Sequence, residues 1–339
     1  MKNLHLSYDD VLLVPKYSSI RSRSEIDIDA NLGKDVQLHL PIIASPMDTI
    51  SETPMANAMG AAGGTAIIHR YNTIERQATM VSKVKQPCVV GAAIGIGGDY
   101  LERASALVAA GATYLCLDVA HGHHVMMKEA LESLRKMLGD DYHLMAGNVA
   151  TLAGINALSD WGADSVRCNI GGGSICSTRI QTGHGMPGLQ TIIECSKTDR
   201  DVKVIADGGI KNSGDMVKAL AAGADAVMVG SLLAATTETP GSITMDIDGN
   251  SWKTYRGMAS KEAQIEWRGK YSSYEGVTTT LRHRGSVSQI LEDLERGIRS
   301  GLSYSGARNI SELQRKAEFV RQTTSGLHES RTHINSRKF

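Results

Sequence analysis

The feature that most constrains the fold of this chain is a series of eight short apolar runs in its first two-thirds. The runs are apolar throughout and do not alternate with polar residues, which is typical of parallel strands buried on both faces. We therefore expect eight such strands. They occupy residues 41–45, 65–69, 88–94, 114–119, 142–147, 165–170, 202–207 and 225–230.

Amphipathic segments rich in Ala and Leu separate these runs, as at 101–111 and 213–223. Several of them end in small residues with a glycine, at 61–64, 109–112 and 221–224, which is typical of a helix C-terminus just before a strand. Eight strand–helix units predict an α/β fold of the (β/α)8 TIM-barrel type. A doubly wound parallel sheet is the competing fold, but it rarely needs eight regular units.

The other segments are expected to decorate one barrel domain that spans residues 1–339. Asp-Gly-Asn between alternating segments predicts a β-hairpin after the eighth strand, and the polar stretch behind it reads as an irregular, mobile flap. The expected additions are an N-terminal arm (1–40), the hairpin (243–256) and flap (257–285) that form one insertion (243–285), two closing helices (287–318) and a polar C-terminal tail (321–339).

Composition narrows the class of protein. Lys+Arg and Asp+Glu both number 36, so no overall positive field favours nucleic acid or an anionic membrane as a partner. The N-terminus does not resemble a signal peptide, and no apolar run has the length of a membrane helix. The five cysteines show no CxxC spacing, which argues against disulfides and structural zinc. We expect a cytoplasmic protein.

In a (β/α)8 barrel the chemistry lies at the carboxyl ends of the strands, and phosphate binds after strands 7 and 8. Strand 7 ends in Gly208-Gly209 and strand 8 in Gly230-Ser231, where backbone amides can approach an anion. A phosphate site is therefore expected, although glycines that merely end strands are the alternative.

The loop after strand 6, GGGSICSTR (171–179), presents Cys176 among hydroxyl groups and Arg179. A thiolate needs such polar, positive surroundings, so Cys176 is the candidate nucleophile. The four other cysteines lie in apolar or helical stretches and read as small core residues: Cys88, Cys116, Cys168 and Cys195.

Other candidate side chains follow further strands of the barrel. Asp118 could bind a substrate hydroxyl or cap a helix, and three histidines at 121–124 read as a solvated loop because no carboxylate or cysteine completes a metal set. The glycines at 95–98 lack the spacing of a dinucleotide fingerprint. The remaining candidates at strand ends are Ser45, Met47, Asp48, Arg70 and Asn148.

Together with GGGSICSTR, five further motifs resemble the IMP dehydrogenase/GMP reductase superfamily over nearly the whole chain. They are ASPMDT (44–49), GNVAT (147–151), ADGGI (206–210), GSLLAATTETPG (230–241) and YRGM (255–258). The resemblance implies a (β/α)8 barrel, usually a homotetramer, whose loop cysteine attacks C2 of a purine nucleotide.

By resemblance, Cys176 is the nucleophile, Thr178 its polar partner and Glu275 the flap carboxylate that relays protons with the threonine. Asp207 would bind the ribose hydroxyls and Met258 the base, while Asp118, Asn148, Gly171 and Arg70 would line the nicotinamide site. The other substrate-binding residues implied are Ser45, Met47, Ser174, Gly209, Gly230, Ser231, Tyr255 and Gly257, of which Ser174, Gly209, Gly230, Ser231 and Tyr255 hold the 5′-phosphate.

Two reactions share this machinery. The dehydrogenase resembles a longer chain with a module after strand 2, absent here, and carries an Arg-Tyr pair in its flap that activates the hydrolytic water. The flap of this chain has Arg268 and Tyr271 but no Arg-Tyr dipeptide, which favours GMP reductase. ASPMDT, GSLLAATTETPG and the tail look more like the dehydrogenase. In that enzyme a similar tail completes a K⁺ site in an adjacent subunit, so Glu329 with Gly171, Gly173 and Cys176 is a candidate potassium site.

The sequence therefore predicts a GMP reductase-like enzyme that converts GMP to IMP and ammonia with NADPH through a covalent Cys176 adduct at C2. A compact IMP dehydrogenase that uses NAD⁺, with water activated by Thr178, Glu275 or Arg268, is the alternative. An FMN-dependent barrel oxidoreductase and a non-enzymatic nucleotide sensor are further alternatives. The family usually has Val-Gly before the glycine-rich turn, whereas this chain has Cys168-Asn169. The resemblance therefore does not predict the course of the backbone near the cofactor.

Overall fold

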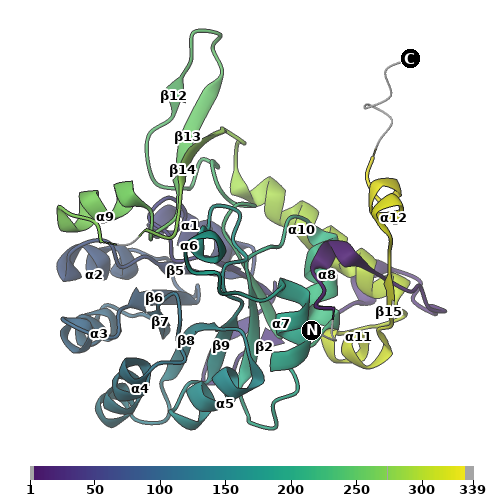
Figure 1. The fold of residues 1–339 in the computed structure, drawn as a ribbon, viewed down its shortest axis with the longest axis horizontal. Helices are drawn as coiled ribbons and strands as arrows, with labels where there is room; N and C mark the ends of the chain where they lie inside the picture. The colour runs from purple at the N-terminus through teal and green to yellow at the C-terminus, as the bar shows by residue number, and fades with distance from the viewer. Residues whose placement is uncertain (1–3, 273, 333–339) are drawn as a thin grey trace.

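Eight parallel strands form a closed barrel in the computed structural model, which describes residues 4–272 and 274–332. The (β/α)8 prediction is confirmed, and each expected apolar run coincides with one barrel strand, of which β8 extends two residues past its run (Figure 1). Around the barrel the strands follow chain order, and β11 closes the ring by pairing with β4. They are β4 (Ile42–Ala44), β5 (Thr65–Ile68), β6 (Val90–Ile94), β7 (Tyr114–Asp118), β8 (His143–Val149), β9 (Ser165–Cys168), β10 (Lys203–Asp207) and β11 (Ala226–Val229).

Helices cover the outside of the barrel, and their ends follow the predicted signals. Gly63, Gly111 and Gly223 lie just past helix ends with φ values of 84°, 95° and 113°, a conformation that glycine adopts without strain. The short helix α6 (Thr178–Thr182) belongs to the loop region between β9 and α7. The helices of the barrel wall are α1 (Thr53–Ala61), α2 (Ile74–Ser82), α3 (Tyr100–Ala109), α4 (Val125–Leu138), α5 (Leu152–Asp160), α7 (Gly188–Cys195), α8 (Ser213–Ala221), α10 (Val287–Tyr304) and α11 (Ile310–Lys316). The last two confirm the expected closing helices.

The core has two parts, one between the strands and the helices and one inside the barrel. The side chain of Tyr114 lies in the core inside the barrel. A Cβ at position 91 would lie 2.4 Å from the Tyr114 ring, so only glycine fits at this position. The short strands β2 (Ala30–Asn31) and β3 (Gln37–Leu38) of the N-terminal arm contribute buried residues to this inner core. The arm thereby closes the end of the barrel opposite the site.

The insertion after β11 is more regular than the sequence indicated. The hairpin is confirmed as β12 (Thr244–Met245) and β13 (Ser251–Arg256), which project from the body of the molecule (Figure 1). The expectation of an irregular segment at 257–285 is wrong, because it holds helix α9 (Lys261–Arg268) and strand β14 (Thr278–Arg282). Strand β14 pairs with β13 into a three-stranded sheet, so a tertiary contact orders polar residues that carry no strand pattern of their own.

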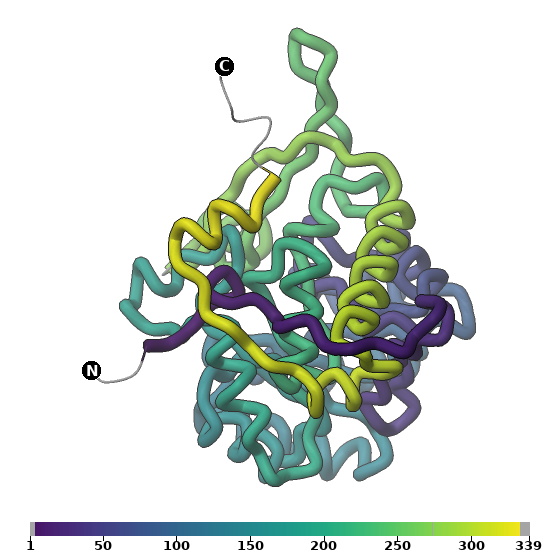
Figure 2. The backbone as a smooth tube through the Cα atoms, turned by 90° about the vertical axis from the view of Figure 1, so that its right-hand side faces the viewer, coloured from purple at the N-terminus to yellow at the C-terminus, as the bar shows by residue number. Residues whose placement is uncertain are grey.

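The described N-terminal segment, in purple, and the described C-terminal segment, in yellow, run side by side (Figure 2). Strand β1 (Val11–Leu13) pairs antiparallel with β15 (Phe319–Arg321). The short helix η1 (Tyr8–Asp10), which precedes β1, and α12 (Thr324–Glu329), which follows β15, therefore lie at the same end of this pair, and η2 (Arg23–Glu25) follows β1 in the chain. The predicted polar tail thus begins within a strand, and its last part, 333–339, lies outside the described residues.

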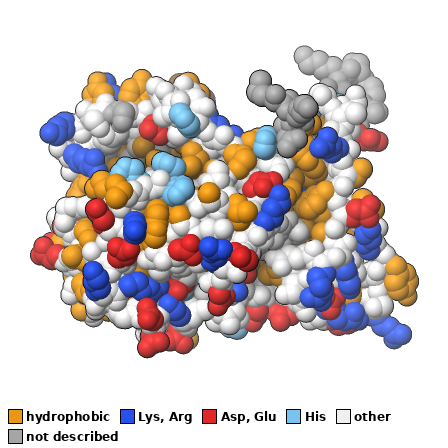
Figure 3. Space-filling model, turned by 60° about the horizontal axis from the view of Figure 1, so that its bottom comes forward, with side chains coloured by type: hydrophobic (Ala, Val, Ile, Leu, Met, Phe, Trp, Pro, Cys, Tyr) orange, Lys and Arg blue, Asp and Glu red, His pale blue; other side chains and the backbone are white. Residues whose placement is uncertain are grey.

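The surface carries charges of both signs. On the face shown in Figure 3, Lys and Arg side chains alternate with Asp and Glu, as expected for a chain with 36 of each kind. Among the described residues, no helix combines the length and the apolar character that a membrane span requires.

Candidate active site

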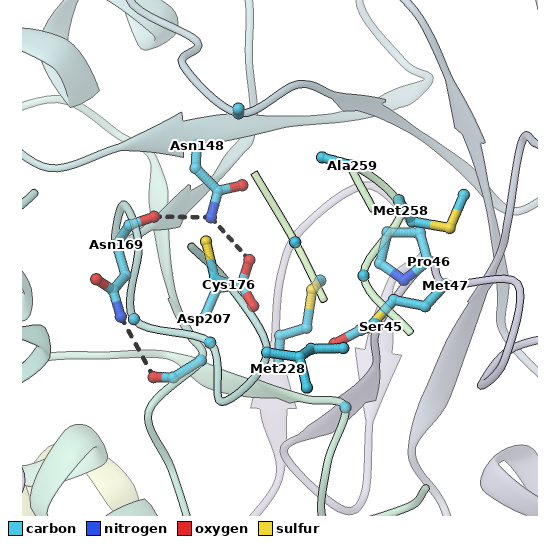
Figure 4. Close-up of a pocket in the computed structure, with 18 of the residues that line it drawn as sticks. Ser45, Pro46, Met47, Asn148, Asn169, Cys176, Asp207, Met228, Met258 and Ala259 are labelled. Atoms are coloured by element: carbon cyan, nitrogen blue, oxygen red, sulfur yellow. Dashed lines mark hydrogen bonds between the residues drawn. The ribbon is translucent and has the colours of Figure 1, made fainter. Parts of the chain in front are cut away.

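A pocket opens at the carboxyl ends of the barrel strands, between the strand loops and the flap (Figure 4). Every predicted catalytic, substrate-binding and cofactor-binding residue lines it. These are Ser45, Met47, Arg70, Asp118, Asn148, Gly171, Ser174, Cys176, Thr178, Asp207, Gly209, Gly230, Ser231, Tyr255, Gly257, Met258 and Glu275. The closure of the barrel brings together loops that lie far apart in the sequence.

Three side chains form a hydrogen-bonded chain at the wall of the pocket. The half-buried Cys176 Sγ lies 3.2 Å from Thr178 Oγ1, which donates to Glu275 Oε2 over 2.6 Å. The flap is fixed to the cysteine loop by backbone bonds, from Ser177 N to Glu275 O at 2.9 Å and from Val277 N to Ile175 O at 3.0 Å. The arrangement can move a proton from the thiol to the carboxylate.

Small residues leave room on the opposite side of the pocket for a compact anion. A Cβ at Gly230 would lie 3.2 Å from both Met47 Sδ and Tyr255 Oη, so the loop after β11 passes close to these side chains because residue 230 is glycine. Burial raises the pKa of Tyr255 and keeps its hydroxyl a proton donor. Backbone amides, hydroxyl groups and the absence of bulk fit the phosphate that the strand ends predict.

Asp207, at the end of β10, is oriented by two neighbours. Its Oδ2 accepts from Arg167 Nη2 at 2.9 Å and from Asn148 Nδ2 at 2.8 Å (Figure 4). Because these bonds converge on one oxygen, Oδ1 is the atom that can accept a hydroxyl from a ligand in the pocket.

The sequence analysis missed Arg167, which occupies the interior of β9. Its guanidinium joins Asp207 and Asp118, and although burial opposes the charge, the two carboxylates raise the pKa of Arg167 well above its usual value. A buried charge needs such partners. A cation inside the apolar run SVRCNI was the signal available in the sequence.

Arg70 and Asp118 form the outer part of the pocket, next to Tyr71, which the sequence analysis also missed. Arg70 Nη2 donates to the carbonyl of Asp118 at 3.2 Å, while its buried Nε has no hydrogen-bond partner within the described part of the chain. This Nε faces Asp118 Oδ2 at 3.9 Å, so the two side chains form an ion pair at the outer side of the pocket. An arginine and a carboxylate are groups that could bind the phosphate and ribose of a dinucleotide, the cofactor that the sequence implies.

Asn169 supports the glycine loop in a way that its place in the sequence did not reveal. It adopts φ of 140°, and its side chain donates to the carbonyl of Gly208 at 3.3 Å. A Cβ at Gly172 would lie 2.0 Å from Asn169 Nδ2. The unusual asparagine and the glycine therefore fit each other, and they carry the loop past the end of β10.

The remaining candidates lie outside this arrangement or serve the scaffold. Asp48 Oδ2 binds the Arg256 guanidinium and so links the first barrel loop to the hairpin. Burial raises the pKa of the Cys116 thiol to about 12, consistent with an inert core cysteine. Glu329 is exposed on α12 and does not line the pocket, so the potassium site with Gly171, Gly173 and Cys176 stays a prediction. No group of three potential metal-ligating side chains exists among the described residues, the histidines of 121–124 included.

Fold and site together define a (β/α)8-barrel enzyme in which a loop cysteine with a hydroxyl–carboxylate relay faces a ligand pocket. The chain belongs to the IMP dehydrogenase/GMP reductase family of oxidoreductases, because the family model for the IMP dehydrogenase / GMP reductase domain matches residues 5–333.

The chain is similar both to relatives named IMP dehydrogenase and to relatives named GMP reductase. An inosine-5′-monophosphate dehydrogenase of Nitrosopumilus maritimus is 32% identical over 97% of this chain and 98% of its own length. A GMP reductase of Leishmania major is 30% identical over 97% of this chain and 96% of its own. The crystal structure of a cysteine-to-alanine variant of Trypanosoma brucei GMP reductase with guanosine 5′-monophosphate superposes with a TM-score of 0.93, at 30% identity over 98% of both chains.

Proposed function

We propose that this protein is a GMP reductase, which converts GMP into IMP and ammonia with NADPH as the reductant. The observation that carries the proposal is the chain Cys176–Thr178–Glu275 on the wall of a pocket shaped for a nucleotide. A sensor needs no such relay. A solved GMP reductase with bound GMP shares the fold, which supports a purine nucleotide as the ligand.

In this proposal the thiol proton of Cys176 passes through Thr178 to Glu275, and the thiolate attacks C2 of GMP. The C2–S bond forms, the bond from C2 to the amino nitrogen breaks, and Glu275 returns the proton through Thr178 to the departing ammonia. A reduced nicotinamide, held by the outer residues of the pocket, would supply the hydride to C2. The C2–S bond then breaks, IMP leaves, and the thiolate is regenerated for protonation.

The other pocket residues orient the nucleotide for this attack. Ser174, Gly209, Gly230, Ser231 and Tyr255 would hold the 5′-phosphate, while Asp207 Oδ1 accepts the ribose hydroxyls. Met258, whose Sδ lies 3.2 Å from the amide nitrogen of Asp48, would contact the base. Asp118, Asn148, Gly171 and Arg70 would hold the reductant on the outer side. Such positioning lowers the barrier because the reacting atoms meet without further loss of entropy.

The flap is the reason to favour the reductase over the dehydrogenase. Hydrolysis of the adduct needs a base beside Cys176, but Arg268 of α9 does not line the pocket, and its guanidinium carbon lies 5.9 Å from the centre of the Tyr71 ring. Arg179 donates to the carbonyls of Ile170 and Met186 and so supports the loop. Chain length does not separate the two activities, since the relatives of both names align over more positions than the 339 residues of this chain.

IMP dehydrogenase remains the second candidate because relatives of that name reach 35% identity, as in Cryptosporidium parvum. The test is the nicotinamide absorbance of the purified protein with GMP plus NADPH and with IMP plus NAD⁺, each with and without K⁺. We expect absorbance to fall with GMP as ammonia is released, and no change with IMP. A rise with IMP and NAD⁺ would overturn the reductase and assign the dehydrogenase.

A further inference from the structure

The loop that follows β11, Gly230–Pro240, is bound from outside by two cations of the hairpin sheet. Lys253 lies on β13 and is 2% exposed. Its ammonium group donates to the carbonyl oxygens of Thr236, at 3.1 Å, and Thr239, at 2.5 Å. A lysine is rarely buried without such acceptors, because desolvating the charge costs free energy.

Arg284, just after β14, binds the same loop nearer to its start. Its Nη1 donates to the carbonyl of Leu232 at 2.8 Å, and its backbone amide donates to the carbonyl of Ala235 at 2.9 Å. Ala235 has φ of 61°, an unfavourable conformation for alanine that needs support from its surroundings. Arg284 Nη1 also lies 3.5 Å from the carbonyl oxygen of Ser231, so five carbonyl groups of one loop accept from Lys253 or Arg284.

The other side of this loop lines the pocket. Gly230 and Ser231 are lining residues, and the carbonyl of Gly230 accepts from the amides of Leu233 and Ala234 at 3.0 Å each. Amides that follow the held carbonyls are used within the loop or behind it, since Leu233 N donates to Gly230 O and Thr237 N donates to Gly285 O, and residue 240 is a proline. The contacts on the outer side therefore act on the pocket by fixing the course of the loop, and with it the positions of Gly230 and Ser231.

Strand β13 contacts the Gly230–Pro240 loop both at the pocket and on the side away from it. Lys253 and Tyr255 are two residues apart and both buried, because alternate residues of a strand share a face. Tyr255 contacts the loop at Gly230, where a Cβ would lie 3.2 Å from its hydroxyl, and Lys253 binds it at Thr236 and Thr239.

We propose that Lys253, assisted by Arg284, is a positioning residue that holds the Gly230–Pro240 loop from behind and thereby sets the affinity of the pocket for the 5′-phosphate of the nucleotide. The inference rests on the proposed function only in taking the anion to be a nucleotide phosphate. The two cations do not touch the ligand and act through the backbone of the loop.

The test compares GMP with guanosine, which lacks the phosphate, in binding to the full chain by calorimetry or competition. The variants are Lys253→Met, which keeps length but removes the charge, and Arg284→Met. We expect Lys253→Met to weaken GMP about tenfold and Arg284→Met about threefold, with guanosine affected less than twofold, since hydrogen bonds to charged groups contribute energies of this order. Arg282→Met is the matched control, because this exposed residue of β14 bonds to Asn250 in the hairpin and should leave both ligands unaffected.

An equal loss for GMP and guanosine would show that the cations only stabilise the fold and would overturn the inference, as would unchanged binding of GMP. If Lys253→Met does not fold, the variant Arg284→Met tests the inference instead, because Arg284 is exposed. The quantity compared is again the loss of GMP affinity relative to the loss of guanosine affinity. A wild-type protein that binds guanosine as tightly as GMP would instead overturn the phosphate site of the proposed function, so the two failures are distinguishable.

Discussion

At the scale of single residues, the proposed relay would need Glu275 as a proton acceptor more than as a hydrogen-bond partner. Its carboxylate accepts from Thr178, yet its main chain is also bonded to Ser177, so the flap stays attached when the side chain changes. This separation of roles makes the carboxylate testable without dismantling the site.

We expect Glu275→Gln to lower kcat about 100-fold, the usual contribution of a general acid–base group, while nucleotide affinity changes less than twofold. The amide can still accept from Thr178 but cannot take up its proton. Steady-state kinetics and nucleotide titration measure the two quantities. Tyr274→Phe, at the exposed neighbour in the flap, is the control, and a variant with near wild-type kcat would remove Glu275 from the relay.

The pair Gly172 and Asn169 provides a second test at this scale. In Gly172→Ala the new methyl group meets Asn169 Nδ2, 2.0 Å away, so either the Asn169 side chain gives up its bond to Gly208 or the loop that carries Cys176 shifts. Overpacking of this kind costs about 1–3 kcal/mol, and we expect kcat/KM to fall at least tenfold. Asn169→Gly, which tolerates the φ of 140°, should restore part of the activity in the double variant. Strictly additive losses would contradict the proposed contact.

At the scale of elements, α9 attaches the flap to the barrel. Trp267 of this helix stacks on Tyr71 of the pocket, with ring centres 6.0 Å apart and planes 17° from parallel. Arg256 also binds Glu266 of α9, although that carboxylate is largely exposed and contributes little. The aromatic pair is therefore the main contact between this helix and the pocket loop.

Trp267→Ala should loosen α9 without unfolding the barrel. An aromatic pair contributes about 0.5–1.5 kcal/mol beyond its buried area, so we expect amide exchange in α9 to quicken about fivefold. Hydrogen-exchange mass spectrometry measures this. Ile265→Ala, at an exposed position of the same helix, should exchange like wild type. Unchanged exchange in the Trp267 variant would mean that other contacts hold the helix.

At the scale of the whole molecule, stability should depend on a histidine in the barrel interior. His143 on β8 is fully buried, and its Nε2 lies 2.8 Å from Ser165 Oγ. Burial lowers the pKa of His143 from 6.5 to about 4. Between these values the unfolded chain binds a proton that the folded chain excludes, so stability falls as the pH drops through this window.

The loss should reach about 3 kcal/mol by pH 4, since one pKa unit corresponds to about 1.4 kcal/mol. Urea unfolding at pH 7 and pH 4.5 measures it. His143→Gln does not titrate and should lose less stability between these pH values than the wild type, whereas His5→Gln, at an exposed site, should behave like wild type. Equal pH dependence in all three proteins would exclude His143 as a cause.

The strands and helices of the barrel can be predicted from local sequence patterns, whereas the helix and the strand of the flap cannot. Each strand carries its own apolar run, because it must be buried on both faces wherever it lies. Strand β14 is polar and exposed, and only pairing with β13 makes it a strand. Helix α9 has only eight residues, is polar on average and buries only Ala263 and Gln264, so its sequence resembles a polar loop, although Ser260 caps the helix and Gly269 ends it.

By itself the sequence determined the barrel, its order and the residue types at the strand ends, because burial and turn chemistry act on neighbours along the chain. Only the tertiary structure decided which of these residues meet. Thr178 and Glu275 are 97 positions apart, and Arg167 reaches Asp207 over 40, through the closure of a ring of strands. Such distances depend on the register of all eight strands at once, which no local stretch of sequence specifies.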